Sequence, residues 1–228
     1  MTNTSLRFLD EKLEKEKDYW LQKLSGDLTV SGVPLDSKRP ALYNDEKQAI
    51  KIDITPDIES KLLKICSGNE SLVFTVAVAA LKICLHKYSA AEDIIVGTTI
   101  HERYAEMASL NKILALRDQV SGAMTVKQLL QDVKATLSEA YSHQKYPFDS
   151  VLNLLQAEHP KNHAALFNVV IVLDNANSRE NVCDLKNDVT LAFSITAESF
   201  NGTIEYNASL FKKESIKLFG EHFKHILG

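Results

Sequence analysis

The residues best suited to chemistry lie in one short run between two apolar patterns. Residues 143–149 read His-Gln-Lys-Tyr-Pro-Phe-Asp, which brings an imidazole, an amide and a carboxylate together. Ser142 precedes the imidazole of His143, but neighbouring residues on one helix do not face each other. The sequence also lacks the Gly-x-Ser-x-Gly turn that exposes a nucleophilic serine. We therefore expect no catalytic residue here, and we expect His143 to interact with the last carbonyl groups of its helix.

The pattern around this run predicts a corner between two helices. Thr125 and Gln128 have the spacing of a capping box at a helix start. Pro147 disfavours a helical conformation at Tyr146 and suits the first position of a second helix. The first helix carries apolar residues at helical spacing that should face a core: Val126, Leu129, Leu130, Val133, Leu137, Ala140 and Tyr141. Such corners are common, so these residues alone favour a structural role.

Other candidate sites have less support. His159 and His163 are four residues apart, but Pro160 interrupts any regular turn between them, so we expect no metal site. The three cysteines lack the spacing of zinc ligands and are odd in number. They are therefore expected to be free thiols in the core of a cytosolic protein.

The corner sequence resembles the His-Gln-x-x-Pro-Phe-Glu motif of condensation domains from nonribosomal peptide synthetases. Residues 17–27 resemble the family's Tyr-Trp-x-x-x-Leu-x-Gly segment, and residues 33–40 resemble its Leu-Pro-x-Asp-x-x-Arg-Pro segment. Further similarities follow in the family's order, in residues 79–103, 166–170 and 204–211. The resemblance therefore extends over nearly the whole chain.

This resemblance implies an α/β fold. The expected architecture is a chloramphenicol-acetyltransferase-like α/β sandwich, here a single lobe with a mixed sheet and flanking helices. The resemblance identifies residues 1–228 as the carboxy-terminal lobe of a condensation domain. Within it we expect a leading helix at 1–25, a coil at 26–47 and the sandwich core at 48–228.

The resemblance also implies a site. In the family, a tunnel runs between two lobes, and carrier proteins deliver substrates on phosphopantetheine arms. Such an arm could visit this lobe, which would hold no cofactor of its own. Arg103 and Arg117 could bind its phosphate, or they could form structural ion pairs. The residues implied to face the tunnel or a partner are Thr98, Arg103, Lys112, Arg117, His143, Gln144, Pro147 and Phe148.

Two departures from the family bear on activity. None of the seven histidines begins a His-x-x-x-Asp sequence, so the family's catalytic His-His-x-x-x-Asp-Gly motif is missing from this chain. Lys112 and Ile113 stand where the family has Asn and Thr, which would remove a hydrogen-bonding pair for the substrate amide. We therefore expect a chain that is inactive alone.

Two functions stay open at this point. The chain could be a noncatalytic lobe that acts as a structural or interaction module beside adenylation and peptidyl-carrier domains. It could instead be half of a working amide-forming enzyme whose N-terminal lobe is on another chain or lies outside this sequence. Both hypotheses predict an exposed apolar face that favours packing with a missing lobe or self-association.

Composition and charge argue against other partners. The net charge is -4, the pI is about 6.0, and lysines alternate with acids near the start, which disfavours nucleic acid. The most apolar run, residues 72–85, spans fourteen residues and contains Lys82, so we expect no membrane span. With no signal-peptide pattern at its start, the chain is expected to be cytoplasmic.

Periodicity predicts the remaining elements of one domain. Helices are expected at 8–25, 55–68, 72–88 and 216–227, besides the two at the corner. Strands are expected at 48–54, 93–100, 110–117, 166–174, 188–197 and 202–207. The helix at 72–88 is apolar on nearly all sides, so it should be enclosed between layers.

Overall fold

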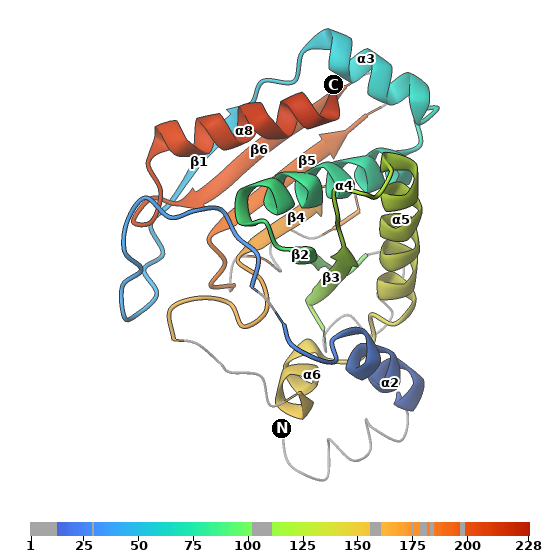
Figure 1. Ribbon diagram of the computed structural model, residues 1–228, viewed down its shortest axis with the longest axis vertical. Helices are drawn as coiled ribbons and strands as arrows, with labels where there is room; N and C mark the ends of the chain where they lie inside the picture. Colours follow the sequence, from blue (N-terminus) through green and yellow to red (C-terminus); the bar gives the residue numbers. More distant parts are fainter. Residues whose placement is uncertain are drawn as a thin grey trace.

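The computed structural model describes residues 13–28, 30–101, 111–155, 161–174, 176–177, 182, 185–196 and 199–228. In this part of the chain the strands are β1 (Lys47–Ile52), β2 (Asp93–Thr99), β3 (Ile113–Gln119), β4 (Val169–Leu173), β5 (Val189–Ile195) and β6 (Phe200–Asn207). They form one mixed sheet in the order β1-β6-β5-β4-β2-β3 (Figure 1). Strand β4 runs parallel to β5 and β2, and the other neighbouring pairs are antiparallel.

Helices α4 (Glu70–Ser89), α5 (Val126–Ser142) and α8 (Lys213–Leu227) pack along the sheet, in front of it in Figure 1. Helix α3 (Pro56–Ile65) lies at one end of the molecule in that view. Helices α2 (Glu14–Lys23) and α6 (Phe148–Leu154) pack together at the other end. The expected α/β lobe with a mixed sheet and flanking helices is therefore confirmed.

Polar side chains define where the helices begin. The Thr55 hydroxyl accepts the N–H of Ile58 at the start of α3. At the start of α5, the Thr125 hydroxyl accepts the N–H of Gln128, while the side chain of Gln128 accepts the N–H of Thr125. The predicted capping box is thus confirmed. These local bonds satisfy donors that a helix start leaves free.

Helix α4 is the core helix of the lobe. It contacts β2, α5 and α8, and most of its residues are buried, which confirms that it does not lie on the surface. It packs beside α5 and α8 on one face of the sheet, however, rather than between two layers (Figure 1). Its length differs from the prediction, because Asn69 accepts the N–H of Leu72 and starts the helix earlier. With 20 residues and a mean hydropathy of 1.4 over 18 of them, it is long and apolar enough for a membrane span. Its burial against the sheet and two helices accounts for this apolar character instead.

Strand β3 begins later than predicted. It runs from Ile113 to Gln119, where the periodicity had indicated 110–117. Its register is set by antiparallel pairing with β2, in which Thr99 is opposite Ile113 and Asp93 is opposite Gln119. Pairing between strands is a tertiary interaction that local sequence does not specify.

Gly97 in β2 leaves space for an aromatic ring. A Cβ atom at this position would lie 2.3 Å from the ring of Phe167, so only glycine fits without displacing that ring. The Phe167 ring in turn lies 5.9 Å from the ring of Phe148 at the start of α6, measured between centroids. By leaving room for the ring of Phe167, Gly97 therefore allows the sheet and α6 to pack together with this ring between them.

Among the described residues, the exposed large apolar side chains lie on four different helices and on the coil of residues 30–46. They are Ile65 in α3, Val126 in α5, Leu154 in α6, Leu218 in α8, and Val30, Leu35 and Leu42 in the coil. Val126 is 62% exposed, so the prediction that it faces the core is wrong. Within the described ranges, this distribution gives no support to the expected apolar face for a second lobe or for self-association.

Candidate functional site

The predicted corner joins α5 to α6 through residues 143–147. His143 is the C-cap residue of α5, and Pro147 is the N-cap residue of α6. Pro147 has φ -63° and ψ 126°, which is an extended rather than a helical conformation. The prediction that Pro147 is the first helical residue is therefore wrong by one position, and α6 begins at Phe148.

Gln144 fastens this corner to the end of β2. Its side-chain Oε1 accepts the backbone N–H of His101 at 2.8 Å, and its Nε2 donates to the carbonyl oxygen of His101 at 3.2 Å. Gln144 is only 4% exposed, so both bonds are shielded from water. The side-chain amide thus forms hydrogen bonds with both the backbone N–H and the backbone carbonyl of one residue, as a neighbouring strand would.

Asn111 fastens the start of β3 to the same corner. Its Nδ2 donates to the carbonyl oxygen of Gln144 at 2.9 Å, and its Oδ1 accepts the N–H of Phe148 at 3.3 Å. Sequence reasoning missed this buried residue, although an Asn two positions before an apolar strand was a visible signal. Lys112 and Ile113 stand where the family has Asn and Thr, but this chain has an amide side chain one position before Lys112.

The imidazole of His143 packs on an aromatic ring. Its centroid lies 4.3 Å from that of Tyr19, with the rings stacked, and its buried Nδ1 has no hydrogen-bond partner within the described residues. The backbone carbonyl of His143 accepts the indole N–H of Trp20 at 2.8 Å. The predicted interaction of this ring with the last carbonyls of α5 is not among the hydrogen bonds of the described residues, whereas the backbone N–H of His143 donates to the carbonyl oxygen of Glu139.

Thr98 is fully buried near the end of β2. The side chains of Thr98 and Asn177 both lie beside the hydroxyl of Tyr141. Burial raises the pKa of Tyr141, and these two polar side chains partly oppose that effect. Asn177 also donates to the carbonyl oxygens of Thr99 and Ile100, at 3.0 and 3.1 Å. These contacts make the end of β2 a closely packed polar region.

Arg117 forms a structural ion pair. Its guanidinium binds both carboxylate oxygens of Asp93, with a shortest distance of 2.7 Å. It also donates to the carbonyl oxygens of Lys23, Ser25 and Asp27, which follow or end α2. Of the two uses considered for Arg117, the structure shows the ion pair. The pair joins β3 to β2, and the hydrogen bonds to the three carbonyl oxygens hold the end of α2 against the sheet.

The remaining predicted residues are placed only in part. Lys112 is exposed, and its carbonyl oxygen accepts the N–H of Ile100 at 3.2 Å. Arg103 lies outside the described residues. The tunnel-facing or partner-facing role of these residues stays a prediction.

A buried ion pair joins α4 to the sheet. Lys82 Nζ lies 3.0 Å from Asp118 Oδ2 and donates to the carbonyl oxygens of Leu116 and Ile94, at 2.6 and 3.2 Å. The Thr136 hydroxyl of α5 donates to Asp118 Oδ1 at 2.6 Å. Burial lowers the pKa of Lys82, and the carboxylate of Asp118 opposes that effect. Sequence reasoning noted Lys82 only as an interruption of an apolar run.

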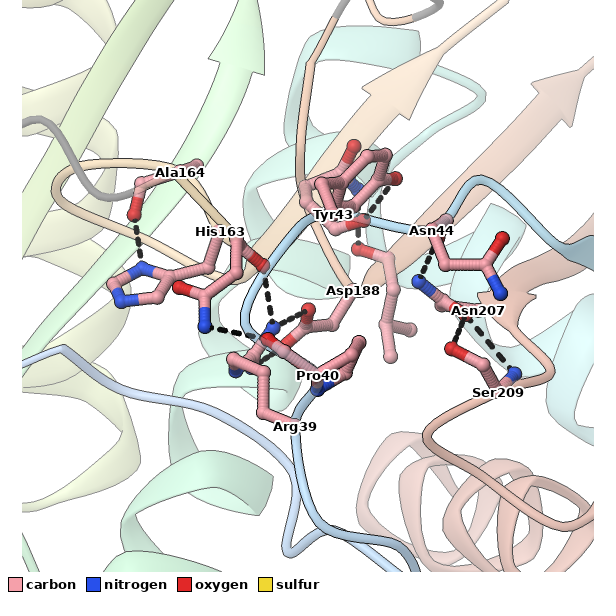
Figure 2. A network of polar contacts seen from close by, with 12 residues as sticks. Arg39, Pro40, Tyr43, Asn44, His163, Ala164, Asp188, Asn207 and Ser209 are labelled. Carbon is pink, nitrogen blue, oxygen red and sulfur yellow. Dashed lines mark hydrogen bonds and ion pairs between the residues drawn. The ribbon is translucent and has the colours of Figure 1, made fainter.

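A second ion pair holds the strap, the name used here for residues 30–46. The Arg39 guanidinium binds both carboxylate oxygens of Asp188, just before β5 (Figure 2). Arg39 also donates to the carbonyl oxygen of Asn162 at 3.2 Å, and the Asn162 amide donates to that of Pro40 at 2.8 Å. The Arg-Pro sequence at 39–40 therefore fastens the strap across segments distant in the chain.

Two further contacts extend this attachment. Asn207 at the end of β6 donates to the carbonyl oxygen of Asn44 at 2.6 Å (Figure 2). Asp36 accepts the N–H of Lys212 and the hydroxyl of Ser215, each at 2.8 Å, at the start of α8. These hydrogen bonds lower the pKa of Asp36. The strap therefore connects the start of β5 and the end of β6 to the start of α8.

Comparison of the sequence with known proteins agrees with this architecture. The condensation-domain profile matches residues 7–228. A linear gramicidin synthase protein from Brevibacillus parabrevis is 32% identical over 237 residues, which cover 95% of this chain and 5% of that protein. Bacitracin synthase 3 from Bacillus licheniformis is 28% identical over 235 residues, covering 95% of this chain and 4% of that protein. The chain thus spans a small fraction of these curated relatives.

Solved structures show the same fold. The X-domain from teicoplanin biosynthesis superimposes with a TM-score of 0.80 at 18% identity, covering 97% of this chain and 56% of that chain. A four-domain nonribosomal peptide synthetase bound to AMP and glycine gives a TM-score of 0.79 at 18% identity, covering 94% of this chain and 19% of that chain. The expected chloramphenicol-acetyltransferase-like architecture is thereby confirmed. The chain belongs to the condensation-domain family and is related to nonribosomal peptide synthetases.

Proposed function

We propose that this chain is a carboxy-terminal condensation lobe that catalyses no reaction alone. It would serve as a structural or interaction module beside adenylation and carrier domains of a synthetase. The main observation behind this proposal is that polar groups of the corner bind or pack against other residues of the lobe. Gln144 binds the backbone of His101, and the imidazole of His143 stacks on Tyr19. Groups engaged in this way support the shape of the lobe, whereas acid–base catalysis needs a group aimed at a substrate proton.

A relative of the same fold supports a protein-binding role. The X-domain of teicoplanin biosynthesis has been solved in complex with OxyB, and that structure covers 98% of this chain at a TM-score of 0.80. Because the identity is 17%, the likeness concerns the fold alone. The interaction surface proposed for this chain thus rests here on an analogy of fold.

One observation favours a second function. The chain aligns with only 51–56% of the solved X-domain, SgcC5 and starter condensation-domain chains. This lobe could thus complete an amide-forming enzyme when a second lobe is supplied. In that case a carrier-bound phosphopantetheine arm would be its visiting ligand.

Amide formation by the chain alone tests the inactivity that both functions predict, and adding a second lobe then separates them. The purified chain is mixed with an aminoacyl-loaded donor carrier and an aminoacyl-loaded acceptor carrier, and the carrier-bound dipeptide is measured by mass spectrometry. We expect no product above the protein-free control. Peptide formation by the chain alone would overturn the noncatalytic proposal.

Two further arms test the interaction role. In the first, a separately expressed N-terminal lobe from the linear gramicidin synthase is added, and restored product would favour the half-enzyme. In the second, binding to the carrier and adenylation domains of the same synthetase is measured by titration calorimetry. Binding without product supports the module, whereas neither binding nor product would count against both functions.

A further inference from the structure

A cleft of about 650 Å³ lies between the start of α4 and the second half of α5. Helix α4 contributes residues at positions 71, 74 and 75, and α5 contributes residues at 134, 137, 138, 141 and 142. These spacings place each set on one face of its helix. His101 closes the end of the cleft beside Tyr141, with the two rings edge to face and their centroids 5.2 Å apart. Two helices therefore supply most of the lining of the cleft.

The cleft has an apolar wall and a polar rim. Phe74, Leu137 and Tyr141 supply apolar surface. The rim carries exposed hydroxyl groups and lysines, namely Ser71, Ser138, Ser142, Lys134 and Lys145. A pocket of this size, with an apolar wall and a few polar groups, is typical of small-molecule sites.

The charge of the cleft is opposite to that of the chain. The chain carries 30 acidic and 26 basic residues, yet its described lining includes two lysines and neither an aspartate nor a glutamate. Neither Lys134 nor Lys145 forms a salt bridge with another described residue. Two cationic groups beside apolar surface complement an anion attached to an apolar body.

We propose that this cleft binds a small molecule with an apolar body and one negatively charged group, such as a carboxylate, sulfonate or phosphate. The body lies on Phe74, Leu137 and Tyr141, and the anion lies between the ammonium groups of Lys134 and Lys145. The Ser138 hydroxyl is placed to donate to the same anion. This inference goes beyond the proposed function and does not depend on it.

Two probes that differ only in charge test the proposal. The first is 8-anilinonaphthalene-1-sulfonate, and the second is N-phenyl-1-naphthylamine, which has the same aromatic body without the sulfonate. Their affinities for the purified chain are measured by fluorescence titration. In the double variant K134A/K145A, we expect the sulfonate probe to bind about fivefold more weakly, as two exposed charge contacts would predict. The neutral probe should change by less than about twofold.

Two further variants serve as a charge-matched control and as a test of the cleft itself. The control K64A/K217A removes two exposed lysines from α3 and α8 and should leave both affinities within about twofold of the parent. Ser138→Trp fills the cleft from an exposed position and should weaken both probes by at least about fivefold, with an unchanged circular dichroism spectrum.

The proposal is overturned if K134A/K145A leaves the affinity for the sulfonate probe unchanged. It is equally overturned if Ser138→Trp leaves both affinities unchanged. Because the measurement is binding by the chain itself, such a failure leaves the proposed interaction role untouched, whereas the calorimetric and amide-forming assays test that role separately.

Discussion

Asp118 and Asp188 are both buried carboxylates that hold a cation, yet they stabilise different regions. Asp118 binds Lys82 between α4 and the sheet, where the two side chains are 4% and 0% exposed. Asp188 binds Arg39 of the strap, which is 16% exposed. Lys82 has no access to water, whereas Arg39 keeps some. The difference indicates that the first pair holds the layers of the core together and that the second holds a surface segment in place.

The largest effect is expected when the core pair is broken. Asp118→Ala leaves the Lys82 ammonium buried without its counter-ion, which should lower the free energy of unfolding by about 3–5 kcal/mol. Urea unfolding followed by circular dichroism measures this loss. The double variant K82M/D118L removes both charges and should recover at least half of it. A loss below about 1 kcal/mol for Asp118→Ala would contradict the assignment of this pair to the core.

A smaller effect is expected at the strap. Arg39→Ala removes charge-assisted hydrogen bonds to Asp188 and should lower the free energy of unfolding by about 2 kcal/mol. Part of that loss should appear as faster protease cleavage within residues 30–46, because the strap is fastened at that point. The exposed neighbour Lys38 gives the control, since Lys38→Ala should change neither quantity. Unchanged cleavage in the Arg39 variant would show that other contacts hold the strap.

The corner between α5 and α6 gives a third case, in which neutral amide groups rather than an ion pair hold two segments together. Gln144→Ala removes two hydrogen bonds to the backbone of His101 and should lower the free energy of unfolding by about 1.5 kcal/mol. A double-mutant cycle with Asn111→Ala should give a coupling of at least about 0.5 kcal/mol, because both amides hold the same corner. The exposed control Ser142→Ala should stay within about 0.5 kcal/mol of the parent. Strict additivity of the two amide variants would mean that they act independently.

Local patterns made much of the fold predictable. The capping box at Thr125 and the apolar periodicity of α4 and α5 depend on residues within one or two turns, so the sequence displays them directly. The boundary of β3 was less accurate, because its register is set by pairing with β2. Val126 fitted the helical period but lies in the first turn of α5, where it faces solvent.

The contacts of the site were harder to predict. Gln144 and His101 are 43 residues apart, and Arg39 and Asp188 are 149 apart, so no local pattern pairs them. The resemblance pointed to the corner and to the Arg-Pro sequence without giving their partners. It also directed attention to Lys112, whereas the buried amide is at Asn111. A shift of one residue in register was enough to hide it.

The smallest effect is expected at the exposed end of the strap. Asp36 has a folded-state pKa below its ordinary value of 3.8, chiefly because the N–H of Lys212 and the hydroxyl of Ser215 donate to its carboxylate. A lowered pKa means that the folded state favours the ionised form, so its contribution is present at neutral pH and is lost as the pH falls through the folded-state value.

Asp36→Asn should therefore be less stable than the parent at neutral pH, by about 0.5 kcal/mol after solvent screening. The difference should shrink as the pH falls through the folded-state pKa of Asp36, because the parent carboxyl is then protonated as well. Urea midpoints of both proteins at neutral pH and at a series of acidic pH values measure it, and the subtraction cancels the titration of the other carboxylates. A difference that persists in acid would mean that Asp36 acts through its shape rather than its charge. The strap would then resemble the neutral corner at Gln144 more than the charged attachment at Arg39.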